Sequence, residues 1–182
     1  MKAIAVRPSV AGSLRLADLE FPEPREDELE VEMVRVGICG TDREIAAGLY
    51  GRPPPGETEL VIGHESLGRV LRAPEGSGFR AGDLVVGIVR HPDPVPCRHC
   101  SIGEWDMCSN GLYTEHGIVG LHGFARERYS LDPARAVRVD RRLGELGVLL
   151  EPATILAKAW EHVERIGTRA FFRPRSALVT GA

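Results

Sequence analysis

Runs rich in valine, isoleucine and leucine recur through the first 90 residues, and clusters of glycine and proline separate them. These runs are "KAIAV" (2–6), "LEVEMVRVGI" (29–38), "LVIGHESLGRVL" (60–71) and "DLVVGIV" (83–89). β-Branched and other apolar residues in short runs are typical of strands, and glycine and proline end them. We therefore expect a mainly β fold with a few helices.

Three segments depart from this β pattern. Residues 42–47 predict a short helix with Thr41 as its N-cap. Residues 51–57, "GRPPPGE", predict an irregular loop, because consecutive prolines suit neither a helix nor a strand ladder. Residues 91–116 show little periodicity and contain three of the four cysteines, so we expect a loop excursion there.

The pattern then returns to short strands at "GFARERYSL" and "AVRV" and changes to helical periodicity after them. Apolar residues recur at helical spacing over residues 150–166, and Gly167 ends the segment. We expect Pro152 to interrupt this segment near its start and a fresh helix to begin at Ala153. The last residues, "SALVTGA", form an apolar run that predicts a strand ending on Gly181.

Composition argues against several classes of partner. The formal net charge is −3, the sequence pI is about 6.1, and both signs of charge are interspersed. We therefore expect neither nucleic acid nor an anionic membrane surface as the main partner. No apolar run approaches the ~20 residues that span a bilayer, and "MKAIAVRPSV" lacks the apolar core of a secretory signal. A cytoplasmic location is the expectation.

A histidine and a glutamate, His64 and Glu65, interrupt the apolar run 60–71, and Cys39 stands at the end of an earlier run. Taken singly, each has an ordinary interpretation as a hydrogen-bonded core histidine or a small buried thiol. Together, a thiolate, an imidazole and a carboxylate are ligands that zinc prefers, and neighbouring glycines free the backbone to aim them into a cleft. Three protein ligands with an open position are typical of a catalytic zinc site.

Four motifs in a fixed order point to one family. "GICGTD", "GHESLGRV", "GDLVVG" and "CRHCSIGEWDMC" together resemble the zinc-dependent medium-chain alcohol dehydrogenases, over nearly the whole chain. Within that family, "GICGTDREI", "RHPDPVPCRHC", "GLYTEHGI" and "GVLLEPATILAKAWE" are most similar to glucose dehydrogenases of the archaeal type. The resemblance implies a GroES-like catalytic domain that oxidises the C1 hydroxyl of an aldose to the lactone, with hydride passing to NAD or NADP.

The resemblance also assigns residues to a catalytic zinc. Cys39 and His64 would hold the ion, Glu65 would be a third ligand or would displace water, and Glu151 would supply a further acidic ligand or a substrate contact. Zinc lowers the pKa of a bound hydroxyl, which favours the release of hydride.

Three more residues receive roles around that ion. Thr41 would contact the substrate and relay its proton, Asp42 would fix the tautomer of His64, and Glu115 would accept a hydrogen bond from a sugar hydroxyl. Helix capping is the alternative for Thr41 and Asp42, and a solvated loop carboxylate is the alternative for Glu115.

Cys97, Cys100 and Cys108 have the spacing C-x2-C-x7-C, which is typical of a structural zinc site and poor for a disulfide framework. The family pattern has a fourth cysteine at the position of Pro94, which cannot bind a metal. Asp93 is nearest to the missing ligand, and His91 and His99 are the other candidates. A site without metal, held by packing, and a water as fourth ligand remain alternatives.

The resemblance divides the chain into a catalytic domain (1–150), a linking helix and linker (151–175) and the first strand of a truncated Rossmann domain (176–182). Gly181 would begin the cofactor-binding glycine motif. A chain of this extent is expected to be inactive alone and to form a dimer or tetramer when full length. Two alternatives remain: a polyol or alcohol dehydrogenase of the same family, and a zinc-stabilised binding module without catalysis.

Overall fold

The computed structural model describes residues 1–21 and 23–180. These divide into two compact units, Met1–Glu151 and Pro152–Ala182. The first unit contains all of the strands in the described part of the chain, which confirms the mainly β fold. Its elements carry the candidate functional residues.

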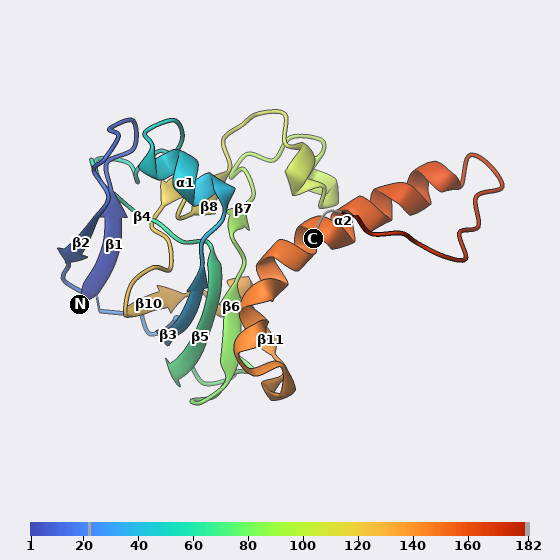
Figure 1. Ribbon diagram of the computed structural model, residues 1–182. Helices are drawn as coiled ribbons and strands as arrows, with labels where there is room; N and C mark the ends of the chain where they lie inside the picture. Colours follow the sequence, from blue (N-terminus) through green and yellow to red (C-terminus); the bar gives the residue numbers. More distant parts are fainter. Residues whose placement is uncertain (22, 181–182) are drawn as a thin grey trace. The chain divides into compact units, whose positions relative to one another are not determined.

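An antiparallel sheet of five strands forms the centre of the first unit (Figure 1). Its strand order is β10 (Arg128–Leu131), β3 (Leu29–Gly37), β5 (Glu65–Arg72), β6 (Leu84–Gly87) and β11 (Ala136–Val139). The runs at 29–38 and 83–89, "GFARERYSL" and "AVRV" thus form strands as predicted. The register pairs Gly37 at the end of β3 with Glu65 at the start of β5.

Two smaller sheets lie in the same unit. One has the order β2 (Arg15–Asp18), β1 (Lys2–Val6) and β4 (Leu60–Val61), and the other has the order β7 (Arg90–His91), β8 (Thr114–His116) and β9 (Gly120–Leu121). The "KAIAV" run is therefore β1, as predicted. The loop predicted at 51–57 has neither helix nor strand, apart from one isolated bridge between Arg52 and Val119.

The run 60–71, which reads as one strand, is divided between two sheets. β4 pairs with β1 and β5 pairs with β3, and residues 62–64 join them without strand structure. Gly63 has a φ of +88°, which side chains rarely tolerate, so the chain turns there. His64 and Glu65 therefore stand at a break between two sheets and not in the middle of a buried strand.

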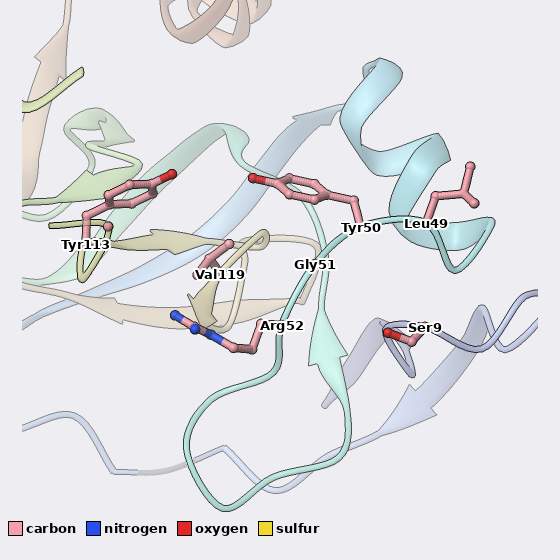
Figure 2. A pocket seen from close by; sticks show the side chains of 8 residues that line it. Ser9, Leu49, Tyr50, Gly51, Arg52, Tyr113 and Val119 are labelled. Atoms are coloured by element: carbon pink, nitrogen blue, oxygen red, sulfur yellow. The ribbon is translucent and has the colours of Figure 1, made fainter. Parts of the chain in front are cut away.

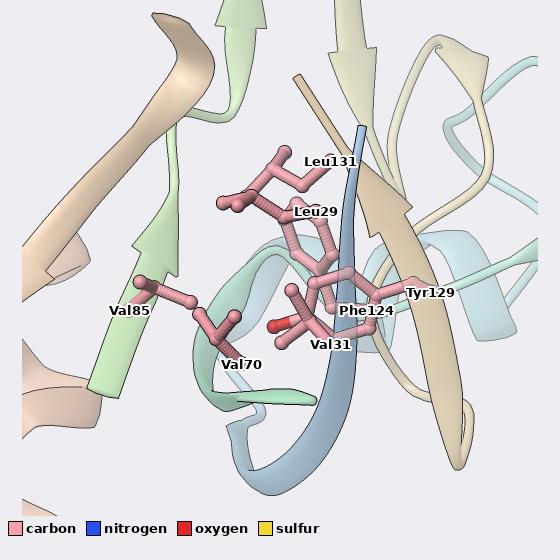
Figure 3. Packing of buried hydrophobic residues seen from close by; sticks show 7 residues of the cluster. All are labelled: Leu29, Val31, Val70, Val85, Phe124, Tyr129 and Leu131. Atoms are coloured by element: carbon pink, nitrogen blue, oxygen red, sulfur yellow. The ribbon is translucent and has the colours of Figure 1, made fainter. Parts of the chain in front are cut away.

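A cluster of seven buried side chains fills one face of the five-stranded sheet (Figure 3). Its members come from β3, β5, β6 and β10 and from the segment before β10, and each is at most 3% exposed: Leu29, Val31, Val70, Val85, Phe124, Tyr129 and Leu131. Burial of a side chain of this size contributes about 1.5–3 kcal/mol. The strands that carry the candidate ligands are therefore held together by apolar packing that does not depend on those ligands.

The excursion predicted at 91–116 is shorter than expected, because β7 and β8 pair and take up its two ends. Residues 92–113 remain outside the sheets and are called the cysteine lobe below. They contain two short 3-10 helices, Cys100–Ile102 and Trp105–Met107.

Two α-helices occur among the described residues. Helix α1 (Gly40–Ala46) matches the predicted short helix, and α2 (Leu150–Gly167) ends on the predicted glycine. Pro152 does not interrupt α2, contrary to expectation. It lies in the first turn, where the missing N–H has no partner to lose and the ring fits the helix.

The strand predicted at "SALVTGA" is not formed in the described residues 176–180, which have no regular secondary structure. A strand of a parallel sheet exists only when a neighbour accepts and donates its backbone hydrogen bonds. Gly181, the predicted start of the cofactor motif, lies outside the described residues.

Candidate metal centre

Cys39 lies where the chain leaves β3 and enters α1. It is the N-cap of α1: its sulfur accepts the backbone N–H of Thr41 at 3.3 Å, and the carboxylate of Asp42 accepts the backbone N–H of Cys39 at 3.0 Å. This reciprocal pair is a capping box, with cysteine in the place of the usual serine or threonine. Thr41 is not the N-cap, contrary to our prediction. Cys39 has the extended backbone of an N-cap residue, and the helix begins at the next residue, Gly40.

His64 lies in the break between β4 and β5, and its ring faces Cys39. The Nε2 atom of His64 lies 3.2 Å from the sulfur of Cys39, and the Nδ1 atom lies 3.6 Å from Oδ1 of Asp42. The same Oδ1 accepts the backbone N–H of Gly63 at 3.3 Å. Asp42, which is only 2% exposed, thus fixes both the start of α1 and the segment that carries His64.

Glu65 completes the group from the first position of β5. The ligand atoms of Cys39, His64 and Glu65 all lie within 4.8 Å of one another. Gly37 makes room for this arrangement, since a Cβ atom there would stand 1.9 Å from Oε2 of Glu65. One sulfur, one nitrogen and one oxygen donor within this distance of one another fit a zinc ion.

The electrostatic environment of this group favours a cation. Burial lowers the pKa of His64, but the Asp42 carboxylate, with Cys39 and Glu151, raises it to about 9. Burial raises the pKa of Asp42, yet His64 and the N–H groups of Cys39 and Gly63 hold it below its ordinary value. A buried imidazole beside an ionised carboxylate is a place where positive charge is stabilised.

Glu151 lies in the first turn of α2 and is half-buried. Burial raises its pKa, and the charges of His64 and Glu65 act on it, so it lies within electrostatic range of both. It does not join the group of ligand atoms within 4.8 Å. Its predicted role as a ligand or a substrate contact therefore stays a prediction.

Glu115 lies on β8 and is 8% exposed, so it is not a solvated loop carboxylate. Its Oε1 atom accepts a hydrogen bond from Nε of Arg90 at 2.9 Å and forms an ion pair with Nη2 of Arg90 at 2.8 Å. Arg90 also stacks over the ring of Tyr113 at 4.1 Å. Sequence reasoning missed Arg90 and Tyr113, because nothing in the sequence pattern links residue 90 to residue 115.

The cysteine lobe holds a second group. The sulfur atoms of Cys97, Cys100 and Cys108 lie within 4.8 Å of one another. The backbone N–H groups of Cys100 and Ser109 lower the pKa of Cys97, whereas burial raises the pKa of Cys100. Three sulfur atoms at this spacing fit a metal that prefers thiolates.

No fourth ligand from the described residues joins these three sulfur atoms. Asp93, His91 and His99, the candidates from the sequence, lie outside the group. The Oδ1 atom of Asp93 accepts the N–H of Val95 at 2.9 Å, whereas its Oδ2 atom is buried without a hydrogen-bond partner. Asp93 therefore keeps a free ligand atom, but the site as it stands supplies only three ligands.

None of the helices in the described part of the chain combines the length and the hydropathy that a membrane crossing requires.

Comparison with known families matches residues 25–141 to the alcohol dehydrogenase GroES-like domain. Among curated proteins, the chain is similar to glucose 1-dehydrogenase of Methanocella arvoryzae, with 43% identity over 183 residues, and to glucose 1-dehydrogenase 1 of Caldivirga maquilingensis, with 42% identity over 184 residues. Each match covers 100% of this chain and 51% of the relative. The chain thus spans about half the length of the curated relatives it matches.

Among solved structures, the chain is similar to Haloferax mediterranei glucose dehydrogenase in complex with NADP, Zn and gluconolactone. The TM-score is 0.81 at 38% sequence identity, and the match covers 95% of this chain and 48% of that one. This likeness extends the family match to the arrangement of strands and helices in space.

Proposed function

The chain belongs to the alcohol dehydrogenase GroES-like domain family, and from this premise we propose that it is the catalytic part of a zinc-dependent, NAD(P)-linked aldose 1-dehydrogenase. The full-length enzyme would remove hydride from C1 of an aldose such as glucose and a proton from its C1 hydroxyl, which gives the lactone. Relatives named glucose 1-dehydrogenase support this choice of substrate.

The observation that carries the proposal is the group formed by Cys39, His64 and Glu65. These three donors meet at the break between two sheets, and Asp42 holds the segments that carry two of them. A zinc ion held there supplies Lewis-acid polarisation of a hydroxyl oxygen. A binding module that used metal only for stability would need the cysteine lobe and would have no use for this group.

The residues around the group have separate tasks. The Asp42 carboxylate lies 3.6 Å from Nδ1 of His64, and its charge favours a proton on that nitrogen, which would leave Nε2, the atom next to Cys39, to bind a metal. The backbone N–H of Thr41 donates to the sulfur of Cys39, which places Thr41 beside the group. We propose that the hydroxyl of Thr41 receives the proton of the substrate. Glu151 lies close enough to act on the charge of His64, and we propose it as a further ligand or a substrate contact.

Glu115 is proposed as the contact for a sugar hydroxyl beside C1. Its Oε1 atom is used by Arg90, so Oε2 is the atom left for the substrate. A buried carboxylate that is already oriented by an arginine discriminates strongly against a substrate without the matching hydroxyl.

The remaining parts of the proposal concern the whole protein. We propose that the chain divides into a catalytic domain (1–150), a linker (151–175) and the first strand of a cofactor domain (176–182). We propose a second metal ion at Cys97, Cys100 and Cys108, with Asp93 as a candidate fourth ligand. The full-length protein would be a homo-oligomer in the cytoplasm. The free state of all four cysteines is consistent with a reducing compartment.

The test uses the full-length enzyme that contains this chain, with NAD and NADP, and compares glucose with a simple primary alcohol. We expect Glu115→Ala to lower kcat/KM for glucose by about ten- to a hundredfold, because a buried polar partner is lost. The simple alcohol should be little affected. Glu115→Gln is the matched control, since it keeps the size of the side chain and one acceptor for Arg90.

Equal losses on both substrates would reject the sugar contact and leave Glu115 a structural role. Higher activity of the unmodified enzyme on simple alcohols than on aldoses would reject the aldose assignment.

A further inference from the structure

A cavity of about 300 Å³ opens between the loop that follows α1 and the segment that leads into β8 (Figure 2). Its polar lining residues are Ser9, Tyr50, Arg52 and Tyr113, and two glycines, a leucine and a valine complete it. This volume is at the lower end of the range of about 300–1,000 Å³ for small-molecule sites.

Backbone hydrogen bonds fix the walls of this cavity. The N–H of Arg52 donates to the carbonyl of Ile118 at 2.9 Å, and the N–H of Gly120 donates to the carbonyl of Arg52 at 2.9 Å. The ring of Tyr113 is held under the guanidinium of Arg90 at 4.1 Å. Figure 2 shows the hydroxyl groups of Tyr50 and Tyr113 pointing toward one another. The backbone around this open hollow is therefore fixed, while the side chains of Ser9, Tyr50 and Arg52 stay exposed to solvent.

Arg90 links the proposed substrate contact to the cavity, because its guanidinium pairs with the carboxylate of Glu115 and lies over the ring of Tyr113, a lining residue. The backbone N–H of Glu115 donates to the carbonyl of Val119, a lining residue, at 2.7 Å. The charge of Glu115 acts both on Tyr50 at the cavity and on Glu151 beside the metal group. An aldose held by Glu115 thus has this cavity next to it.

The lining is rich in donors and has no acid. Arg52 is exposed to solvent and offers only donors, and no ion pair of its guanidinium occurs within the described part of the chain. Burial raises the pKa of Tyr50, so its hydroxyl stays a donor. The acids whose charge acts on Tyr50 are Glu115, whose carboxylate is paired with Arg90, and Glu44, and neither lines the cavity.

A subsite for neutral sugar hydroxyls is expected to contain acceptors such as carboxylates, whereas an arginine with phenolic hydroxyls suits an oxygen-rich anion. We propose that the cavity binds an anionic group, phosphate or carboxylate, at the end of the substrate distal to C1. The inference rests on the proposed function for its substrate class and deepens it: the preferred substrate is an acidic aldose.

The experiment measures binding by calorimetry on the full-length protein, with glucose, glucose 6-phosphate, glucuronate and inorganic phosphate as separate ligands. Glucose 6-phosphate, glucuronate or both should bind at least about tenfold more tightly than glucose, which is the usual gain from a charge-assisted hydrogen bond. The two acidic sugars distinguish phosphate from carboxylate as the preferred group.

Arg52→Met should remove that gain, with a loss of about tenfold for the acidic sugar and little change for glucose. Tyr50→Phe should weaken the acidic sugar by about threefold. Arg69→Met is the matched control, because Arg69 is an exposed arginine on β5 that does not line the cavity, and it should change neither affinity. Far-ultraviolet circular dichroism verifies that each variant is folded.

The inference is overturned if the acidic sugars bind no more tightly than glucose, or if Arg52→Met and Arg69→Met weaken them equally. It is also overturned if inorganic phosphate binds as tightly as glucose 6-phosphate, since the cavity would then hold a free ion. Oxidation of glucose without preference for acidic sugars would leave the proposed function intact. Arg52-dependent binding without oxidation of any aldose would overturn the proposed function alone.

Discussion

The candidate metal group at Cys39, His64 and Glu65 and the cysteine lobe lie in the same unit, but the chain holds them differently. The first group draws on β3, α1 and β5, and long-range bonds fix it, including Gly63 to Asp42 at 3.3 Å and Phe124 to Gly63 at 2.8 Å. In the lobe, the backbone bonds are local, such as Ser101 to Cys97 at 2.9 Å.

Closure of the lobe depends on few contacts between distant residues. The side chain of Asn110 donates to the carbonyl of Val95 at 3.1 Å, and Arg90 donates to the carbonyl of Trp105 at 3.2 Å. The first group is therefore fixed by the sheet, whereas only few long-range contacts close the lobe. A segment with few long-range contacts opens locally more easily than a packed sheet does.

The largest expected effect separates the two groups by substitution. In the full-length enzyme, Cys39→Ser should remove one zinc ion per chain and lower aldose oxidation by at least about a thousandfold, because several kcal/mol of polarisation are lost. The melting temperature should change little, since packing holds the strands. Cys108→Ser is the counterpart and should remove only an ion of the lobe. Metal analysis and steady-state kinetics verify both, and full zinc content in Cys39→Ser would break the comparison.

A smaller effect is expected when the support of His64 is weakened. Asp42→Asn keeps one oxygen, for the N–H of Cys39, but loses the acceptor for the N–H of Gly63 and the charge that faces His64, so zinc affinity should fall by about ten- to a hundredfold. Asp140→Asn is the matched control, because Asp140 also accepts a backbone N–H at a helix start, far along the chain. Competition with a chelator measures the affinity. A fall in melting temperature with unchanged affinity would mean that Asp42 only caps α1.

The smallest effect concerns the lobe. Removal of metal by a chelator, or Cys100→Ser, should raise the rate of tryptic cleavage after Arg98 by about tenfold, since metal binding restricts the open states of a loop. Cleavage after Arg80, in a turn without metal ligands, is the internal control. Equal cleavage with and without chelator, together with unchanged metal content, would show that packing alone closes the lobe.

Features that depend on near neighbours in the chain were predictable. The apolar runs became β1, β3 and β6, and C-x2-C-x7-C brought three sulfur atoms together. Alternation within a run and the spacing of ligands in one loop are local properties. The errors were also local in kind. The N-cap fell on Cys39, and Pro152 fits the first turn of α2, because caps and first turns are set by backbone angles that residue type only biases.

The sequence by itself determined which chemistry the chain carries: a thiol, an imidazole and carboxylates in motifs that identify the family. Only the tertiary structure decided which of them meet. The register of β3 against β5 places Glu65 opposite Gly37, and the pairing of β7 with β8 joins Arg90 to Glu115. The cavity at Tyr50, Arg52 and Tyr113 is likewise lined by segments that lie apart in the sequence. A one-residue change of register reverses the face of every side chain on a strand, so such contacts are fixed by long-range packing and not by local pattern.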